Sequence, residues 1–148
     1  MARIDLRIMR GHHAPAEAIG YRLVALRLVT DVSLATDTGW SPFKQAVIDT
    51  GAPVSVFPPV IWKQCRHTPL GRAKIGGLAR GEECQLPAIL AEIDCTLSDG
   101  QRVLAPIRIH AYLVEIENAP TLVGMLGFIE RGVLRVELSR NRAFLRMT

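Results

Sequence analysis

The residues best suited to chemistry in this chain are an aspartate, a threonine and a glycine that lie between two apolar runs. Ala46-Val47-Ile48 leads into Asp49-Thr50-Gly51, and Ala52-Pro53-Val54-Ser55-Val56-Phe57 follows. Because Asp is depleted from strands and costly to bury, a carboxylate between two buried strands needs hydrogen-bond partners. Gly51 lets another backbone approach closely, and Thr50 can hydrogen-bond while it packs as a β-branched side chain. By itself the pattern fits a catalytic carboxylate and a simple turn aspartate equally well, and motifs later in the chain decide between them.

A second Asp-Thr-Gly at residues 37–39 shows that the tripeptide alone is weak evidence. It follows Leu34-Ala35-Thr36 instead of an apolar run, and Trp40-Ser41-Pro42 comes after it. Asp37 lies only twelve residues before Asp49, which is too short a distance for a second lobe. We expect residues 35–42 to form a turn between the strands that feed the Asp49 loop.

The composition is that of a single globular domain over residues 1–148. The chain has 49% hydrophobic and 22% charged residues, and its length is sufficient for a core without disulfides. The net charge is +4, but the arginines are spread along the sequence and aromatic residues make up only 5%. A nucleic-acid-binding surface would need a basic stripe with interleaved aromatics. We therefore expect a solvated surface and no nucleic-acid partner.

The cysteines and histidines do not have the spacing of a metal site. They are Cys65, Cys84, Cys95, His12, His13, His67 and His110. We expect reduced thiols, no metal and no cofactor, as in a cytoplasmic protein. Charged residues interrupt the N-terminal apolar pattern, and no apolar run approaches the roughly 18 residues of a membrane span. The sequence thus predicts a soluble, cytoplasmic protein without a membrane partner.

Hydrophobic alternation predicts a mostly β chain. The expected strands cover residues 3–9, 19–30, 43–48, 84–97, 103–113, 121–124, 133–138 and 142–147. Loops are expected at 10–17 and 66–73, turns at 98–100 and 139–141, and a hairpin tip at Gly76-Gly77. Residues 60–64 can form a short helix. Residues 125–131 have room for about two helical turns, which Gly132 would end as a C-cap.

The chain carries, in order, Asp-Thr-Gly-Ala, a glycine-rich hairpin, an apolar-apolar-Gly element, a short helix and closing strands. This order resembles that of the retroviral-type aspartic proteases, the retropepsins, over about residues 19–138. Asp49-Thr50-Gly51-Ala52 matches their active-site loop, and Ile75-Gly76-Gly77-Leu78 resembles the tip of their flap. Leu122-Val123-Gly124 matches the apolar-apolar-Gly element that packs beside the loop. The resemblance, closest in length to bacterial single-domain members, implies an all-β, retropepsin-like closed β-barrel (the acid protease fold). It further implies one short C-terminal helix and activity as a homodimer.

Two positions depart from the viral pattern. Viral members carry an ion pair between an Arg after the apolar-apolar-Gly element and an Asp four residues after the catalytic Asp. Met125 and Pro53 occupy these positions here. Because both charges are absent together, no unpaired buried charge results. Residues 1–18 and the tail from Ser139 also lack a clear viral counterpart, so the dimer contacts of this chain need not be the viral ones.

Peptide hydrolysis by an aspartic protease needs two carboxylates that share a proton. One activates a water, and the other polarises the scissile carbonyl. One suitable loop supplies one carboxylate, so the second Asp49 is expected from a second chain across a two-fold axis. The resemblance implies that the two Thr50 hydroxyls bond across this axis.

An extended substrate would lie beneath the two flaps. By the same resemblance, the substrate-binding residues are Ala52, Val56, Ile75, Gly76, Gly77, Leu78 and Leu122, and they imply an apolar preference around the cleavage site.

The sequence therefore predicts an aspartic endopeptidase that hydrolyses peptide bonds through a water activated by an Asp49 dyad, with Asp49, Thr50 and Gly51 as the catalytic set. The alternative is a catalytically silent dimeric module for binding or assembly, in which Asp49 is a relic. The intact triplet favours the enzyme. A barrel that binds a small ligand has no positive feature in the sequence.

Overall fold

A computed structural model describes residues 2–76 and 85–148, and the expected flap residues Gly77 and Leu78 lie outside these ranges. The described chain is mostly β-sheet with a few short helices, as predicted for an all-β protein. The strands are β1 (Arg3–Asp5), β2 (Arg7–His12), β3 (Val24–Leu34), β4 (Lys44–Ile48), β5 (Ser55–Phe57), β6 (His67–Ile75), β7 (Leu86–Ser98), β8 (Ile107–Val114), β9 (Leu122–Val123), β10 (Gly132–Glu137) and β11 (Arg142–Met147). The helical segments are α1 (Ala14–Glu17), α2 (Pro59–Trp62), η1 (Met125–Ile129) and η2 (Leu138–Arg140).

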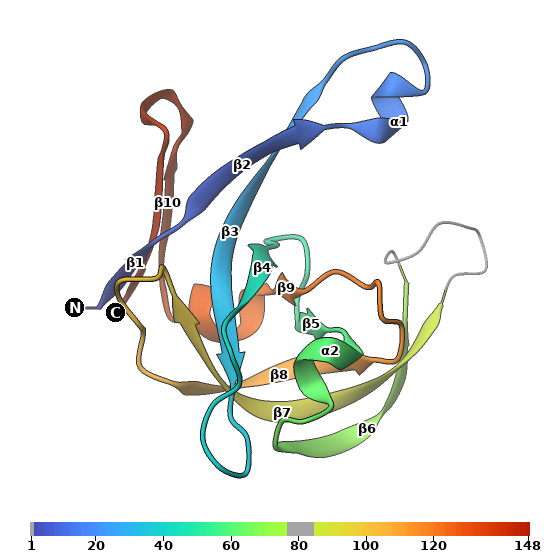
Figure 1. The fold of residues 1–148 in the computed structure, drawn as a ribbon, viewed down its shortest axis with the longest axis vertical. Helices are drawn as coiled ribbons and strands as arrows, with labels where there is room; N and C mark the ends of the chain where they lie inside the picture. Colours follow the sequence, from blue (N-terminus) through green and yellow to red (C-terminus); the bar gives the residue numbers. More distant parts are fainter. Residues whose placement is uncertain (1, 77–84) are drawn as a thin grey trace.

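The strands form two sheets (Figure 1). A small sheet has the order β1-β11-β10, and a large sheet has the order β2-β3-β4-β9-β5-β8-β7-β6. An additional pairing of β3 with β7 closes six strands of the large sheet, from β3 through β4, β9, β5 and β8 to β7, into a ring of pairings. Most pairs are antiparallel, but β4 with β9 and β5 with β8 are parallel.

Strand alternation places one apolar set inside this ring. On β7, the residues predicted to share a face are buried, with Ala91, Cys95 and Leu97 at 0% exposure, and Ile89 packs against the same core. Phe57, Phe128 and Leu145 join the core from other elements. The helix α2, predicted at residues 60–64, is anchored by the Trp62 Nε1–H, which donates to the Val114 carbonyl at 2.8 Å.

The expected loop at residues 66–73 is wrong, because residues 67–73 belong to β6. This strand pairs with β7 along its length, with an irregular register between Pro69 and Gly71. It is the last strand in the sheet order, so the missing N–H of Pro69 can face the open edge without breaking a ladder. The proline and glycine that suggested a loop therefore mark an irregular edge strand.

The expected loop at 10–17 and the single C-terminal helix also need correction. Strand β2 continues to His12, α1 follows it, and β3 begins only at Val24. The segment η1 is not a continuous two-turn helix, because Gly127 adopts φ 114° and ψ −105°. Gly132 begins β10 and is not a C-cap. A Cβ there would lie 2.7 Å from the Arg146 carbonyl oxygen, so glycine permits close strand packing.

The return strand after β7 also begins later than predicted. Residues 103–106 hold only a bridge between Ser98 and Val103, and β8 starts at Ile107, directly after Pro106. Proline lacks the N–H that a ladder needs, so the regular pairing with β7 resumes beyond it. The turn predicted at 139–141 is confirmed, with Asn141 in the left-handed conformation at φ 51°.

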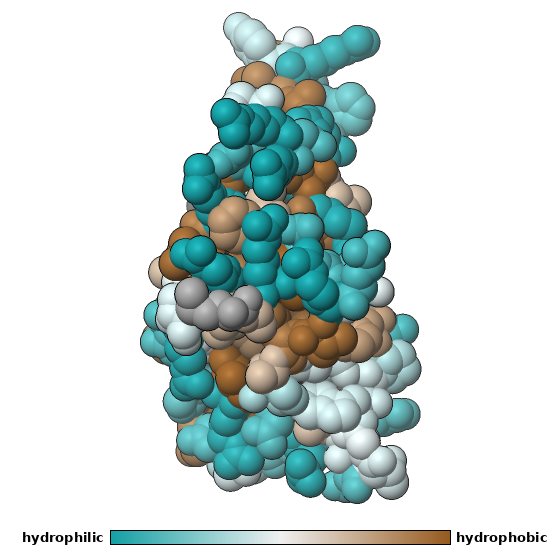
Figure 2. All heavy atoms as spheres, turned by 90° about the vertical axis from the view of Figure 1, so that its left-hand side faces the viewer, coloured by the Kyte–Doolittle hydropathy of each residue, from teal (hydrophilic) through white to brown (hydrophobic). Residues whose placement is uncertain are grey.

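The small sheet gathers arginines that are spread along the sequence. Figure 2 looks onto the side that carries the chain ends, and hydrophilic side chains cover its upper part. A pocket of about 350 Å³ on this sheet is lined by Arg3, Arg135, Glu137, Arg140, Arg142, Phe144 and Arg146. Asp5 and Glu137 form ion pairs with three of these arginines. The even spread expected from the sequence is therefore replaced by one basic, partly neutralised face.

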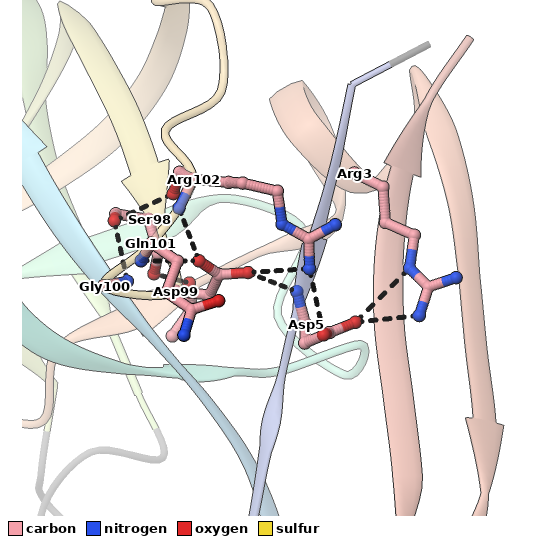
Figure 3. A network of polar contacts seen from close by, with 8 residues as sticks. Arg3, Asp5, Ser98, Asp99, Gly100, Gln101 and Arg102 are labelled. Atoms are coloured by element: carbon pink, nitrogen blue, oxygen red, sulfur yellow. Dashed lines mark hydrogen bonds and ion pairs between the residues drawn. The ribbon is translucent and has the colours of Figure 1, made fainter.

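A polar network fastens the small sheet to the turn after β7 (Figure 3). The Asp5 backbone N–H donates to Asp99 Oδ2 at 3.0 Å, and the Gln101 and Arg102 backbone N–H groups donate to Asp99 Oδ1 at 2.9 and 2.7 Å. The Arg102 guanidinium lies 2.9 Å from Asp5 Oδ2 and 3.2 Å from Asp99 Oδ2. The Asp99 side chain is only 9% exposed, so it is the centre of this junction.

No described helix has both the length and the apolar character that crossing a bilayer requires.

The Asp99 junction predicts a pH-dependent contribution to stability. Burial alone would raise the pKa of Asp99, but the backbone donors of Asp5, Arg102 and Gln101 and the Arg102 guanidinium lower it to about 2. Since an unfolded Asp has a pKa of about 3.9, the contribution is present above about pH 4 and is lost as the pH falls from about 4 to about 2.

We expect Asp99→Asn to lower the free energy of unfolding at neutral pH by about 1–2 kcal/mol, with the difference shrinking towards about pH 2. Urea unfolding across this pH range measures both quantities, and Asp37→Asn in an exposed turn is the matched control. A deficit that stays constant from neutral to acid pH would contradict this account of the junction.

Candidate active site

Asp49 is held by an extension of strand pairing. The parallel ladder between β4 and β9 ends at Ile48 and Val123, and the Asp49 N–H continues it by donating to the Val123 carbonyl at 2.9 Å. The Ala52 N–H donates to the Asp49 carbonyl at 3.2 Å, and the Gly51 N–H donates to Asp49 Oδ1 at 2.9 Å. The carboxylate is partly exposed. The loop thus presents one oriented, accessible carboxylate at the end of a fixed strand.

Backbone groups directly after β9 form hydrogen bonds with the Asp49 loop. The Met125 N–H donates to the Ala52 carbonyl at 2.8 Å, and the Leu126 N–H donates to the Pro53 carbonyl at 3.0 Å. The Gly124 N–H donates to Ser55 Oγ at 3.1 Å. These bonds satisfy backbone groups of the loop and of the segment after β9 together, which explains why the two motifs occur in one chain.

Gly124 cannot carry a side chain in this arrangement. A Cβ at Gly124 would lie 2.6 Å from the Val54 carbonyl carbon and 2.8 Å from the Ala52 carbonyl oxygen. Both contacts are to backbone, which cannot rotate away as a side chain can. The glycine of Leu122-Val123-Gly124 is therefore required for the loop to pack against β9.

Strand alternation divides the residues around Asp49 between two faces. Ile48, Phe57 and Val123 belong to the main core. The residues between them on the same strands belong to a second apolar cluster, which we call the cleft cluster. It comprises Val56, Ala88, Val114 and Leu122, with Val47, Ile75, Tyr112 and Ala119 packed against them. Because Asp49 follows Val47 by two positions, it lies on the same face as this cluster.

Several of the predicted site residues come together at this face. Val56 and Leu122 are paired across β5 and β9 and are 4% and 9% exposed, and Ile75 packs against them from β6. Ala52 is half-buried in the loop, whereas Thr50 and Gly51 are exposed. Gly76 is exposed directly after β6, and Gly77 and Leu78 lie outside the described residues.

Five members of the cleft cluster were not predicted from the sequence. They are Val47, Ala88, Tyr112, Val114 and Ala119. The alternation of β7 and β8 could have indicated Ala88, Tyr112 and Val114, since each lies opposite the predicted core face. Alternation in the sequence does not assign Val47 to a face, because its neighbours Ala46 and Ile48 are apolar as well.

Asp37-Thr38-Gly39 forms the turn that the sequence predicted. Ala35 and Trp40 form an isolated bridge, the Thr36 N–H donates to the Gly39 carbonyl at 2.8 Å, and Gly39 adopts φ +154°. This turn precedes β4, whereas Asp49 follows it, so the two aspartates lie at opposite ends of that strand. Asp37 therefore does not supply a second carboxylate next to Asp49.

Two cavities of the described chain are not lined by Asp49. A cavity of about 370 Å³ lies between the Asp37 turn and α2, and another of about 540 Å³ lies against β6 and β7. Asp49 lines neither of them. The Asp49 carboxylate therefore lies outside these two cavities, on the face of the strands that carries the cleft cluster.

Among the described residues, no three His, Cys, Asp or Glu side chains are close enough to hold a metal ion. Cys65 and Cys95 are free and buried in the main core, and burial raises the pKa of both thiols. His67 lies edge-on to Trp62 with ring centroids 5.6 Å apart, which is a packing role.

No protein-family model matches this chain, and a search of the curated proteins finds no match to it.

The packing at Gly124 predicts a sharp stability effect. Gly124→Ala should lower the free energy of unfolding by about 2 kcal/mol or more, because a methyl group would overlap the backbone of Ala52 and Val54. Urea unfolding of both proteins measures the difference. Gly71→Ala is the control, since a Cβ there has no atom within 4 Å. Equal stability of the two variants would contradict the proposed packing.

Proposed function

We propose that the chain is a retropepsin-like aspartic endopeptidase that acts as a homodimer. The observation that supports this best is the Asp49-Thr50-Gly51 loop, braced by Gly124 and placed on the same face as the cleft cluster. We further propose that the ring of pairings from β3 to β7 is the closed barrel of the acid protease fold.

The mechanism needs the Asp49 carboxylates of two chains to lie close together. Two such groups cannot both ionise, so they share one proton and titrate as a pair. The ionised partner takes a proton from a water, which attacks the scissile carbonyl, and the protonated partner donates to the carbonyl oxygen. The Gly51 N–H at Asp49 Oδ1 would fix the orientation of each carboxylate during both steps.

The substrate is proposed to be a peptide or protein segment in extended form. The hairpin of β6 and β7 would act as the flap, and backbone hydrogen bonds along its edge would hold the peptide. Val56, Ile75 and Leu122 would contact side chains near the cleavage site, so we expect an apolar preference there. The proposal involves no cofactor and no nucleic acid, and it places the reaction in the cytoplasm.

The central test is a comparison of two aspartates. Asp49→Asn should lower the rate of peptide cleavage by about 10²–10⁴-fold or more while the protein stays folded, because an amide cannot act as a base. Asp37→Asn should retain activity close to that of the parent chain, because its turn lies at the other end of β4. Cleavage of an apolar-centred peptide library provides the readout, and circular dichroism checks folding. Inactivation by Asp37→Asn alone would show that the Asp37 loop, and not the Asp49 loop, is catalytic.

The shared proton predicts a bell-shaped rate profile centred on acid pH, because one aspartate must be ionised and the other protonated. A statine-type mimic, with a hydroxyl at the position of the attacking water, should compete with substrate. Rates measured from acid to neutral pH, with and without the mimic, test both expectations. A dimer that cleaves no peptide would favour the binding or assembly module instead.

A further inference from the structure

An arm built from β2, α1 and the start of β3 rises beyond the closed ring (Figure 1). Within the part of the chain that the structure describes, strand β2 pairs only with β3, from Arg7 opposite Val29 to His12 opposite Val24. The far end is ordered by backbone bonds. The His13 N–H donates to the Leu23 carbonyl at 3.0 Å, and the Tyr21 N–H donates to the Ala16 carbonyl at 2.9 Å. The arm is thus a defined element and not a loose tail.

The arm begins at the level of Asp49. The pairing of β3 with β4 starts at Leu28 opposite Ile48, the residue directly before Asp49. Among residues 2–76 and 85–148, residues 24–27 of β3 pair with β2 alone. The arm therefore extends past the catalytic loop into the space on the loop's outer side.

Apolar side chains gather on this arm. Among the described residues, sixteen large hydrophobic side chains are exposed, and six of them lie between residues 9 and 26. They are Met9, Ile19, Tyr21, Leu23, Val24 and Leu26, with exposures from 43% to 73%. A two-stranded ribbon is marginally stable by itself, and an apolar surface of this kind marks an interaction site.

The position of the arm indicates which molecule contacts it, namely a second copy of this chain. A second copy that brings its Asp49 to the first across a two-fold axis must stand directly opposite the Thr50 loop. The arm occupies the flank of that space, so it runs along the second copy. Because the two-fold contact is reciprocal, each copy then receives the arm of the other.

The charges agree with this placement. Residues 7–29 carry four arginines and one glutamate, a charge of +3 with the histidines neutral. Of these arginines, Arg7 forms an ion pair with Asp31 outside this range. Residues 115–120 carry Glu117 and Glu115, which pairs with Lys63, and no basic residue. This acidic segment adjoins the cleft cluster through Ala119. An arm that reaches around a partner's cleft would meet opposite charge there.

The small sheet is a poorer surface for the same contact. Its central strand β11 already pairs on both sides, with β1 and with β10. Five arginines and two acidic residues stand on or beside one of its faces, so a two-fold contact through that face would bring like charges together.

We infer that the arm is the clasp that holds two copies of the chain together so that their Asp49 loops meet. The inference rests on the proposed function, which requires two copies for one site. In the dimer, the second copy covers the exposed apolar side chains between residues 9 and 26 of the arm. The clasp thereby brings the two Asp49 loops together without contacting the reacting atoms.

The test is a comparison of charge insertions on the full chain. Val24→Glu combined with Leu26→Glu places two carboxylates on the arm, at side chains that are 63% and 43% exposed. Val103→Glu, at a side chain that is 58% exposed in the turn after β7, is the matched control. Sedimentation velocity over a concentration series gives the dimer dissociation constant, and circular dichroism melting checks the fold.

We expect a dimeric parent chain, a dissociation constant raised about 100-fold or more in the arm variant, and no change in the control. Should the double substitution disturb folding, Ile19→Ser with Tyr21→Ser at the exposed tip replaces it. Arm variants that dimerise like the parent would overturn the clasp and leave the peptidase proposal standing.

A parent chain that stays monomeric at every concentration would overturn both proposals. Dimers that depend on the arm but cleave no peptide would support the clasp and count against the peptidase alone. Val136→Glu on β10, a side chain that is 41% exposed, reports on the small sheet. Dissociation by that variant, with intact dimers in the arm variant, would place the contact on the small sheet instead.

Discussion

The missing side chain at Gly124 is the constraint on which the geometry around Asp49 depends. Because no Cβ intervenes, the backbone after β9 packs against the backbone of Ala52 and Val54, and the Met125 and Leu126 N–H groups donate to the Ala52 and Pro53 carbonyls. The loop is therefore held by backbone contacts, which do not change rotamer. A carboxylate on such a loop has a fixed position, which is the preorganisation that the proposed proton transfer would require.

The two-residue period of the strands makes this loop part of a surface. On β4, β5 and β9, one set of side chains fills the ring and the alternate set forms the cleft cluster beside Asp49. The same strands thus fill the main core with one face and the cleft cluster with the other. A register shift of one residue would exchange the two faces, so the parallel pairing of β4 with β9 determines which side chains lie on the same face as Asp49.

Strand β3 links the separate parts of the molecule. Over eleven residues it pairs first with β2 in the arm, then with β4 beside the Asp49 loop, and finally with β7, where it closes the ring. One continuous strand therefore connects the proposed clasp to the Asp49 loop. The Asp99 junction then joins the small sheet to the turn that ends β7, so the element carrying both chain ends is tied to the same ring.

The sequence alone was sufficient to indicate a mostly β chain and the turn at Asp37, because these features depend on local alternation and on residues with strong backbone preferences. That Leu122-Val123-Gly124 packs beside the Asp49 loop was implied only by the resemblance to the retropepsins. The sequence did not reveal that residues 67–73 belong to β6, since an edge strand tolerates Pro69 and Gly71, nor the arm, the arginine face or most of the cleft cluster. Those features depend on which strands become neighbours. Only the tertiary structure decides this, because pairing between distant segments is set by the packing of the whole core and not by the local order of residues.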